Sequence, residues 1–594
     1  MLREVLRPRG RAKTSMEEAI ALVGEERLAE AEAALRALCI ARPDDAAPRL
    51  WLGRVLYRQK KQGAAIVALE QALEIDPAST DALYLLGRAR IDNLDYVQAV
   101  AALRRVTALL PAWGPGWLAL ADALNGAGDA DAAEAHYLRA LEIDPGLAVA
   151  AYNYGILLEK LARGGEAVRY YRRAIEIDPG FRIAHSNLLF ALTRSDETTP
   201  EAVFREHLEW ARQHAEPLTA KSQPHARRAR GTRLRVGYVS PDFRDHPVTY
   251  FFEPVLEHHD RSRFETYCYS DVRVPDARTR RMRELADAWR DTRALSDEAL
   301  ADLVRSDRIN ILVEFTGHTR DERLLVFARR PAPIQITWMG YPNTTGISAM
   351  DYRISDHYAD PPGMTEALHS ERLLRLPEIY MPFAVPLEDA PLQPPPMLER
   401  GFATFGSFNS AAKLTDSMLR VWGRILRSVP SARLLILDIP EGRARERITT
   451  LIASEGVDAS RVEMRGRLDY REFWDAYNEV DVALDTHPCS GTTTTAHTLW
   501  MGVPVVTLPG RAHASRVALT MLTNAGLARW VAASENEYVA IAADLAREPA
   551  RLQALRPDLR DRMRRSPNMD GARFTRFLEA AYERAWEDWY APSA

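Results

Sequence analysis

A run of four threonines is the passage of this sequence with the clearest chemistry. In DVALDTHPCSGTTTTAHTLWMG (481–502), we expect an apolar strand to end at Asp485 and a helix to begin within 492–495. The first N–H groups of a helix have no partner inside the helix, so hydroxyl groups beside them suit a bound phosphate. N-capping is the alternative, but a cap needs only one hydroxyl. The passage therefore favours a diphosphate site.

A lysine and two histidines follow other expected strands. Lys413 lies in the strand-to-helix loop of SFNSAAKL, where a cation can reach the same phosphates, although a lone lysine is more often a surface residue. His246 follows LRVGYVS (234–240), and His318 follows NILVEFTG (310–317). Ligands of parallel sheets bind at the carboxyl ends of strands, so we expect both histidines to point into a cleft.

These residues need parallel sheets to position them. From residue 233 onward, strand phrases alternate with helix-like segments, which predicts a doubly wound α/β architecture. A proline-rich linker at 386–400 interrupts the alternation, which begins again with FATFGSF. The sequence therefore predicts two Rossmann-like lobes, 233–385 and 401–590, with a ligand cleft between them.

The first third of the chain, 15–196, is a repeat with a period of 34 residues. The residues that keep this step are Pro43, Pro77, Pro111, Pro145 and Pro179; Ala31, Ala65, Ala99, Ala133 and Ala167; and Gly53, Gly87, Ala121 and Gly155. This pattern is typical of tetratricopeptide (TPR) repeats, in which small residues let paired helices approach and proline ends the second helix. We expect an all-α superhelix with a concave groove for extended peptides or partner proteins. The alternative is an array that only dimerises or spaces the molecule.

A linker should follow the repeats. Residues 197–232 begin as a helical extension and become polar, basic and proline-containing, without periodicity. The basic cluster Arg227, Arg228 and Arg230 resembles a nucleic-acid patch, but a solvated hinge is the commoner meaning of such a run.

Composition narrows the class of protein. A chain of 594 residues should hold several domains, and 78 basic against 82 acidic residues demand no nucleic-acid partner. The cysteines, Cys39, Cys268 and Cys489, form no disulfide framework or metal pair, which favours the cytoplasm. The sequence shows no run of about 18 apolar residues and no secretory signal, so we expect neither membrane insertion nor export.

These motifs resemble the O-linked N-acetylglucosamine transferase and SPINDLY family, glycosyltransferase family 41. The resemblance covers the repeats and the phrases LRVGYVSPDFRDHP, RRPAPIQITWMGYPNTTG, DYRISDHYADPP, SFNSAAKL, LDTHPCSGTTTT and LWMGVPVVTLPG. It implies a GT-B fold and transfer, with inversion, from a nucleotide sugar to Ser or Thr hydroxyls of proteins that the TPR groove presents.

The resemblance also implies roles for single residues. His246 matches the cleft histidine of the family, a general base or orienting group, and Lys413 matches the lysine that steadies the donor diphosphate. The candidate catalytic residues are His246, His318 and Lys413. The candidate donor-binding residues are Tyr341, Ser410, Lys413, Leu468, Gly491, Thr493, Thr494, Thr495 and His497. We expect no metal or other cofactor, because a lysine and a helix N-terminus can stabilise the leaving diphosphate.

Two departures from the family concern the donor. His497 stands where animal members have the carboxylate that is expected to hold the ribose, and Phe473 stands where the family often has histidine. The phrases EFTGHT, YPNTTG, ADPP and GTTTT look closer to the SPINDLY branch, whose plant members use GDP-fucose, while bacterial relatives are generally regarded as N-acetylglucosamine transferases. We predict UDP-N-acetylglucosamine as the donor and keep GDP-fucose as the alternative. A non-catalytic TPR scaffold and a transferase for small molecules or polysaccharides are further alternatives.

Overall fold

The computed structural model describes residues 15–222, 225, 233–387 and 390–591. By its contacts the chain divides into two units, one ending at Leu157 and one beginning at Leu158. The boundary falls inside the predicted repeat array, so the last repeat helices belong to the second unit. The basic cluster Arg227, Arg228 and Arg230 lies outside the described residues.

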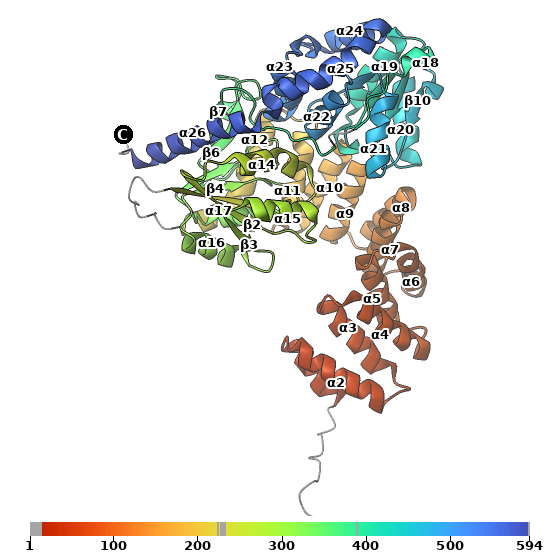
Figure 1. The fold of residues 1–594 in the computed structure, drawn as a ribbon. Helices are drawn as coiled ribbons and strands as arrows, with labels where there is room; N and C mark the ends of the chain where they lie inside the picture. Colours follow the sequence, from red (N-terminus) through yellow and green to blue (C-terminus); the bar gives the residue numbers. More distant parts are fainter. Residues whose placement is uncertain (1–14, 223–224, 226–232, 388–389, 592–594) are drawn as a thin grey trace, which may run out of the picture. The chain divides into compact units, whose positions relative to one another are not determined.

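The first unit is built of helices that follow the predicted 34-residue period (Figure 1). They are α1 (Met16–Gly24), α2 (Leu28–Ala41), α3 (Ala46–Arg58), α4 (Gln62–Ile75), α5 (Thr80–Asp92), α6 (Tyr96–Leu109), α7 (Gly114–Gly126), α8 (Ala130–Ile143) and the first part of α9 (Ala148–Lys160). Pro43 and Pro77 each follow the end of a second helix by two residues, as the sequence predicted.

Glycine permits close helix contacts in these repeats. A Cβ atom added at Gly53 would lie 2.5 Å from Cγ of Leu69, and one added at Gly87 would lie 2.5 Å from Cγ of Leu103. Both leucines are fully buried. The paired helices therefore approach until a leucine of one helix touches the backbone of the other, which a larger residue at the glycine would prevent.

Four helices precede the sheets in the second unit: α10 (Gly164–Ile177), α11 (Arg182–Thr193), α12 (Pro200–His214) and α13 (Glu216–Thr219). Leu189 and Trp210 from these helices form one buried cluster with Leu324, Ile347 and Ala349 of the first lobe. This shared core explains why the contacts place α10–α13 with the lobes rather than with the first unit.

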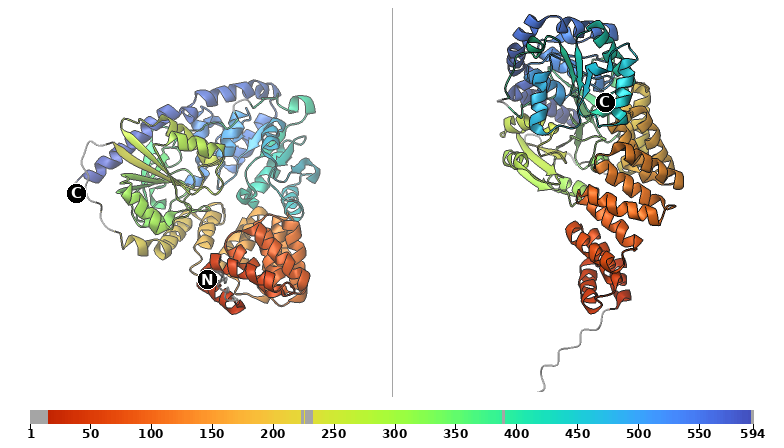
Figure 2. Two further views of the ribbon diagram at one scale, coloured as in Figure 1. Left: turned by 60° about the horizontal axis from the view of Figure 1, so that its bottom comes forward. Right: turned by 90° about the vertical axis from the view of Figure 1, so that its right-hand side faces the viewer.

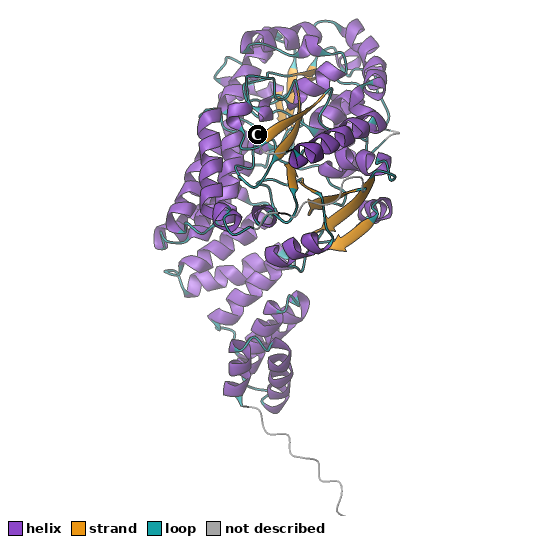
Figure 3. Cartoon of the chain, turned by 90° about the vertical axis from the view of Figure 1, so that its left-hand side faces the viewer, coloured by secondary structure: helices purple, strands orange, loops and turns teal. Residues whose placement is uncertain are grey.

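Two parallel sheets form the rest of the second unit (Figure 3). The first has the order β3-β2-β1-β4-β5-β6-β7, and the second has the order β10-β9-β8-β11-β12. The strands are β1 (Leu234–Ser240), β2 (Phe264–Ser270), β3 (Ala288–Asp291), β4 (Ile311–Glu314), β5 (Ile334–Thr337), β6 (Tyr352–Asp356), β7 (Arg372–Leu376), β8 (Thr404–Ser407), β9 (Arg433–Ile436), β10 (Val462–Met464), β11 (Val482–Leu484) and β12 (Val505–Val506). The predicted two-lobed α/β architecture is confirmed.

Each sheet reverses its strand order at one place. The reversal lies between β1 and β4 in the first sheet and between β8 and β11 in the second. Ligands of doubly wound sheets bind outside the carboxyl ends of the strands at such switch points. His246 and His318 come after β1 and β4, whereas Lys413 and the threonine run come after β8 and β11. His246, His318, Lys413 and the threonine run thus follow the four switch-point strands, whereas Tyr341 follows β5 and Leu468 follows β10.

Helices connect and cover these strands. They are α14 (Pro247–His258), α15 (Ala277–Leu285), α16 (Asp297–Ser306), α17 (Leu324–Ala328), α18 (Met397–Arg400), α19 (Asp416–Ser428), α20 (Arg443–Ala453), α21 (Tyr470–Ala476), α22 (Thr493–Trp500), α23 (Val517–Asn524), α24 (Glu535–Ala546), α25 (Pro549–Arg565) and α26 (Gly571–Tyr590). Within the described ranges, no helix has the length and apolar character that crossing a bilayer requires.

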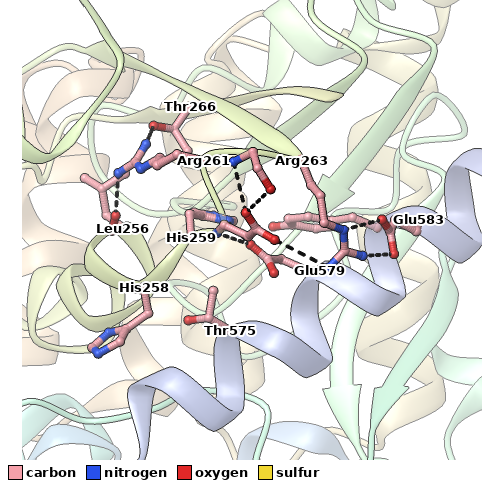
Figure 4. A network of polar contacts seen from close by, with 12 residues as sticks. Leu256, His258, His259, Arg261, Arg263, Thr266, Thr575, Glu579 and Glu583 are labelled. Atoms are coloured by element: carbon pink, nitrogen blue, oxygen red, sulfur yellow. Dashed lines mark hydrogen bonds and ion pairs between the residues drawn. The ribbon is translucent and has the colours of Figure 1, made fainter. Parts of the chain in front are cut away.

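The last helix departs from the predicted domain boundaries. The sequence assigned 401–590 to one lobe, but α26 packs on α14, β5 and β7 of the first lobe (Figure 2). Glu579 of α26 accepts hydrogen bonds from His259 Nδ1 at 2.9 Å and from the Asp260 N–H at 2.8 Å (Figure 4). Because Phe574, Leu578 and Tyr582 are buried with Glu579, this helix needs the first lobe to cover its apolar face.

Candidate active site

Asp485, directly after β11, holds the loop that leads to the threonine run. Its Oδ1 accepts hydrogen bonds from the Gly491 N–H at 2.7 Å and from Asn409 Nδ2 at 3.2 Å, and its Oδ2 accepts one from Thr507 Oγ1 at 2.7 Å. Burial raises the pKa of this carboxyl group. Asp485 therefore ties the ends of β8 and β11 together and fixes the path of the loop.

Gly491 is a position in this loop that only glycine fits. A Cβ atom there would lie 2.5 Å from Thr494 Oγ1 and 2.7 Å from Thr495 Oγ1. Thr495 Oγ1 donates a hydrogen bond to the Gly491 carbonyl at 3.0 Å, and Thr494 Oγ1 donates one to Asn409 Oδ1 at 3.0 Å. The backbone thus runs directly against the hydroxyl groups that open the helix.

The start of α22 is not capped by a side chain. Thr492 occupies the N-cap position, but its hydroxyl makes no capping hydrogen bond. The first hydrogen bond of the helix runs from the Ala496 N–H to the Thr492 carbonyl at 3.1 Å. Within the described part of the chain, the Thr493 hydroxyl forms no hydrogen bond. The N-capping interpretation is therefore wrong, and the helix start is available to an anion.

Lys413 is next to this helix start. It ends a short 3₁₀ helix (Ala411–Lys413) after β8, and its Nζ donates a hydrogen bond to the Ser490 carbonyl at 2.7 Å. The side chain is half-buried. Ser490 directly precedes Gly491, so the ammonium group lies beside the loop that enters α22. The predicted convergence of a cation and a helix N-terminus is present in the structure.

His246 is the N-cap residue of α14. Its Nδ1 accepts a hydrogen bond from the Val248 N–H at 3.3 Å. Burial, with a smaller contribution from Arg244, lowers the pKa of His246 to about 4, so the ring is neutral at pH 7. Nδ1 also lies 3.6 Å from Asp242 Oδ2, so these contacts are compatible with a proton on either ring nitrogen. The ring is only partly covered, which leaves Nε2 available to a substrate oxygen.

His318 does not point into a cleft, so that expectation was wrong. The ring is fully buried, and its Nε2 lies 2.8 Å from the Thr345 carbonyl. Its neighbours are aromatic: the ring centroid is 4.5 Å from Trp210 and 5.4 Å from Tyr341. Burial holds the pKa of His318 well below its usual value. The residue stabilises the junction between α12 and the first lobe, and its position gives no support to a catalytic role.

Tyr341 belongs to the same junction. It is buried, and its hydroxyl lies 2.8 Å from His207 Nε2 and 3.4 Å from Thr193 Oγ1. The loop that carries Tyr341 is also held by Arg353, whose Nη2 donates to the Tyr341 carbonyl at 2.9 Å. Direct contact of the Tyr341 ring with a donor has no support from this geometry.

His497 lies in α22, one turn beyond the threonines, inside a cluster of aromatic rings. Trp474 is the nearest, with 4.5 Å between ring centroids, followed by Phe383 at 5.8 Å and Tyr250 at 6.1 Å, and Phe473 lies at 6.4 Å. The histidine is buried, and neither ring nitrogen has a hydrogen-bond partner among the described residues. Burial lowers the pKa of His497 to about 3. Phe473 and His497, the two departures from the family, therefore lie in the same aromatic cluster.

The other predicted donor-binding residues lie in neighbouring loops. Ser410 is the exposed residue that begins the 3₁₀ helix of Lys413, and half-buried Leu468 lies between β10 and α21. The sequence analysis missed Asn409, which links Asp485 to Thr494. Its signal was a polar residue at the end of a switch-point strand.

The chain has helical repeats followed by two parallel sheets, and a lysine lies beside an uncapped helix start at a switch point. These features define a class of repeat proteins joined to a two-lobed module that binds a phosphate-bearing ligand. The model described as glycosyl transferase family 41 matches residues 184–383 and 398–578, and tetratricopeptide-repeat models match 16–82, 59–124, 115–147 and 148–181. The chain belongs to glycosyl transferase family 41. The predicted family and fold class are confirmed.

Known relatives support this assignment. The chain is 42% identical over 407 residues to a rice (Oryza sativa subsp. japonica) protein named probable UDP-N-acetylglucosamine–peptide N-acetylglucosaminyltransferase SPINDLY; the match covers 67% of this chain and 44% of the relative. The Arabidopsis thaliana protein of the same name is 40% identical over 412 residues, covering 68% and 44%. This chain thus spans less than half the length of these relatives. The structure of a Thermobaculum terrenum O-GlcNAc transferase mutant matches with a TM-score of 0.77 at 36% identity, covering 92% of this chain and 98% of that one.

Proposed function

We propose that this protein is an inverting O-glycosyltransferase that moves a sugar from a nucleotide donor to Ser or Thr hydroxyls of proteins. The observation that carries the proposal is the position of Lys413, whose Nζ is bound to Ser490 beside the uncapped start of α22. A cation and free helix N–H groups are what a nucleoside diphosphate needs as a leaving group. Family membership supports the same activity.

The chemical step develops negative charge on the diphosphate as the bond to the sugar breaks. In the proposed donor complex, Lys413 Nζ exchanges the Ser490 carbonyl for a phosphate oxygen. The N–H groups of the first α22 turn and the Thr493 hydroxyl donate to the same diphosphate. Removing one such preorganised donor typically slows an enzyme by about 10²–10³-fold.

His246 is neutral at pH 7 and only partly covered. With its proton on Nδ1, near Asp242, its bare Nε2 can take the proton of the acceptor hydroxyl. With its proton on Nε2, the ring orients the sugar or the acceptor through Nε2–H. We therefore propose His246 as the general base or as an orienting group.

UDP-N-acetylglucosamine is the proposed donor. The names of the rice and Arabidopsis relatives and of the solved Thermobaculum structure all specify N-acetylglucosamine transfer. GDP-fucose is the second candidate, because His497 of α22 departs from the family pattern and lies among aromatic rings without a polar partner. A neutral histidine can accept from or donate to a base or a ribose.

The remaining assignments concern the setting of the enzyme. We propose that the TPR groove presents acceptor proteins and that the same array can form a homodimer. We also propose that the protein acts in the cytoplasm and needs no metal. The test is incubation of the full chain with each labelled nucleotide sugar and a mixture of proteins, followed by release of the label from Ser and Thr by β-elimination. Donor binding without any transfer to protein would favour the scaffold alternative instead.

A further inference from the structure

A cavity of about 230 Å³ lies in the second unit beside the loop that Lys413 contacts. Its wall includes Thr193, the last residue of α11, Asn343 and His369 of the first lobe, and Pro488 and His513 of the second. Whole-ligand sites are usually about 300–1,000 Å³, so this volume suits one group of a ligand rather than a complete nucleotide sugar.

Two of the wall residues share one buried carboxylate. His369 Nε2 lies 3.2 Å from Asp360 Oδ1, and His513 Nδ1 lies 2.6 Å from Asp360 Oδ2. All three side chains are buried. The two histidines hold the pKa of Asp360 well below its usual value, so this group is a carboxylate that can only accept hydrogen bonds. Each histidine must therefore donate to it.

This arrangement leaves the other nitrogen of each ring for a ligand. Burial lowers the pKa of His513 to about 4, so its ring is neutral at pH 7, and because Nδ1 donates to Asp360, Nε2 is a bare acceptor. Among the described residues, neither His369 Nδ1 nor His513 Nε2 has a hydrogen-bond partner, and both atoms are buried. A buried polar atom without a partner is unfavourable, so two of them in one cavity wall call for a ligand that forms hydrogen bonds.

The cavity borders the proposed phosphate site. Ser490, whose carbonyl accepts from Lys413, receives its own support from the loop of His513: its N–H and its hydroxyl donate to the Ala514 carbonyl at 2.9 Å and 3.1 Å. Pro488, two residues before Ser490, lies in the cavity wall. A group bound in the cavity would therefore be next to the diphosphate. The transferred sugar and the acceptor hydroxyl must meet at this place.

We propose that this cavity is a hydroxyl-binding subsite of the transferase, in which His513 Nε2 and His369 Nδ1 form hydrogen bonds with hydroxyl groups. The hydroxyl groups come either from the transferred sugar or from the Ser or Thr acceptor. The proposal rests on the transferase function and adds to it two positions outside the diphosphate site. Asp360 is the positioning residue, because it sets which nitrogen of each ring is left for a ligand.

The test uses variants that keep the hydrogen bonds to Asp360. His513→Asn places an amide N–H where Nδ1–H was and removes the Nε2 acceptor, and His369→Gln does the same for the other ring. Ala512→Leu narrows the cavity and keeps both histidines in the sequence, since Ala512 lies in its wall. The control is His258→Gln, at the end of α14, whose Nδ1 contacts the Pro254 carbonyl at 2.7 Å.

The experiment combines transfer kinetics with calorimetric titration. The full-length proteins are titrated with UDP, GDP, UDP-N-acetylglucosamine and GDP-fucose. For a sugar subsite, affinity for the nucleotide sugar should fall about tenfold in both histidine variants, while affinity for the nucleoside diphosphate stays unchanged. For an acceptor subsite, donor affinity should stay unchanged, and kcat/KM for the acceptor should fall about tenfold. Control values should match the parent protein in either case.

Two results would overturn the proposal, and they are distinguishable. If the folded variants, including Ala512→Leu, keep normal nucleotide-sugar affinity and normal acceptor kinetics, the subsite is wrong while the transferase function stands. If the parent protein binds no nucleotide sugar, the proposed function fails and the subsite fails with it.

Discussion

Lys413→Ala should separate catalysis from folding. The folded protein loses one hydrogen bond, from Nζ to the Ser490 carbonyl at 2.7 Å, on a half-buried side chain. This contact is worth about 0.5–1.5 kcal/mol, so the thermal midpoint of unfolding should fall by only a few degrees. In the transition state, the same ammonium faces the charge that develops on the diphosphate. Its loss should raise the barrier by about 2.7–4 kcal/mol and slow transfer by about 10²–10³-fold.

The assay is single-turnover transfer from the nucleotide sugar, with saturating donor, so that weaker binding does not hide the chemical step. Lys221→Ala is the control, because Lys221 is an exposed lysine of the same unit, after α13. Circular dichroism and thermal unfolding check that both variants fold. A Lys413→Ala protein that transfers at a rate near that of the parent would refute the assignment of the phosphate site.

Further variants test the neighbouring features. Thr493→Val should weaken nucleoside diphosphate binding by about tenfold in calorimetry, since the hydroxyl is free to bind a phosphate. The control, Thr498→Val, removes a hydrogen bond to the Thr494 carbonyl and should keep the affinity of the parent protein. Equal affinities of the two variants would contradict the role of the helix start. His497→Phe should make the free energy of unfolding less sensitive to acid. A histidine with a pKa of about 3 when folded and 6.5 when unfolded contributes stability above pH 6.5 that is lost as the pH falls, at about 1.4 kcal/mol per pH unit. Urea unfolding at pH 6.5 and pH 5 measures this loss, and an equal loss in the parent protein and the variant would contradict the prediction. Glu579→Ala should lower the free energy of unfolding by about 2–3 kcal/mol, because His259 and the Asp260 N–H lose their buried acceptor, and a change below about 0.5 kcal/mol would contradict that role for α26.

The 34-residue period and the alternation of strand and helix segments made much of the fold predictable from the sequence. The prolines at a 34-residue step mark helix ends because proline has no N–H for the helical ladder, and the glycines mark helix contacts because a Cβ atom would meet a leucine. Lys413 and the threonine run could be predicted for a similar reason: each follows an apolar strand, and parallel sheets bring the ends of strands together.

The errors arose where long-range packing decides. His318 follows a switch-point strand as His246 does, yet α12 covers it with Trp210, and nothing local in NILVEFTGHT signals this cover. The return of α26 to the first lobe likewise depends on contacts more than 300 residues apart, such as Glu579 with His259. Asp360 could not be linked to His369 and His513 either, because the second histidine is 153 residues away.

The most decisive experiment is calorimetric titration of the folded full-length protein with UDP, GDP, UDP-N-acetylglucosamine and GDP-fucose. We predict that UDP and UDP-N-acetylglucosamine bind in the presence of a chelator, with lower affinity in Lys413→Ala. Selective binding of GDP and GDP-fucose would keep the diphosphate site and change the sugar. Binding of none of the four to the folded protein, or equal affinities of Lys413→Ala and the parent protein, would contradict the proposed diphosphate site.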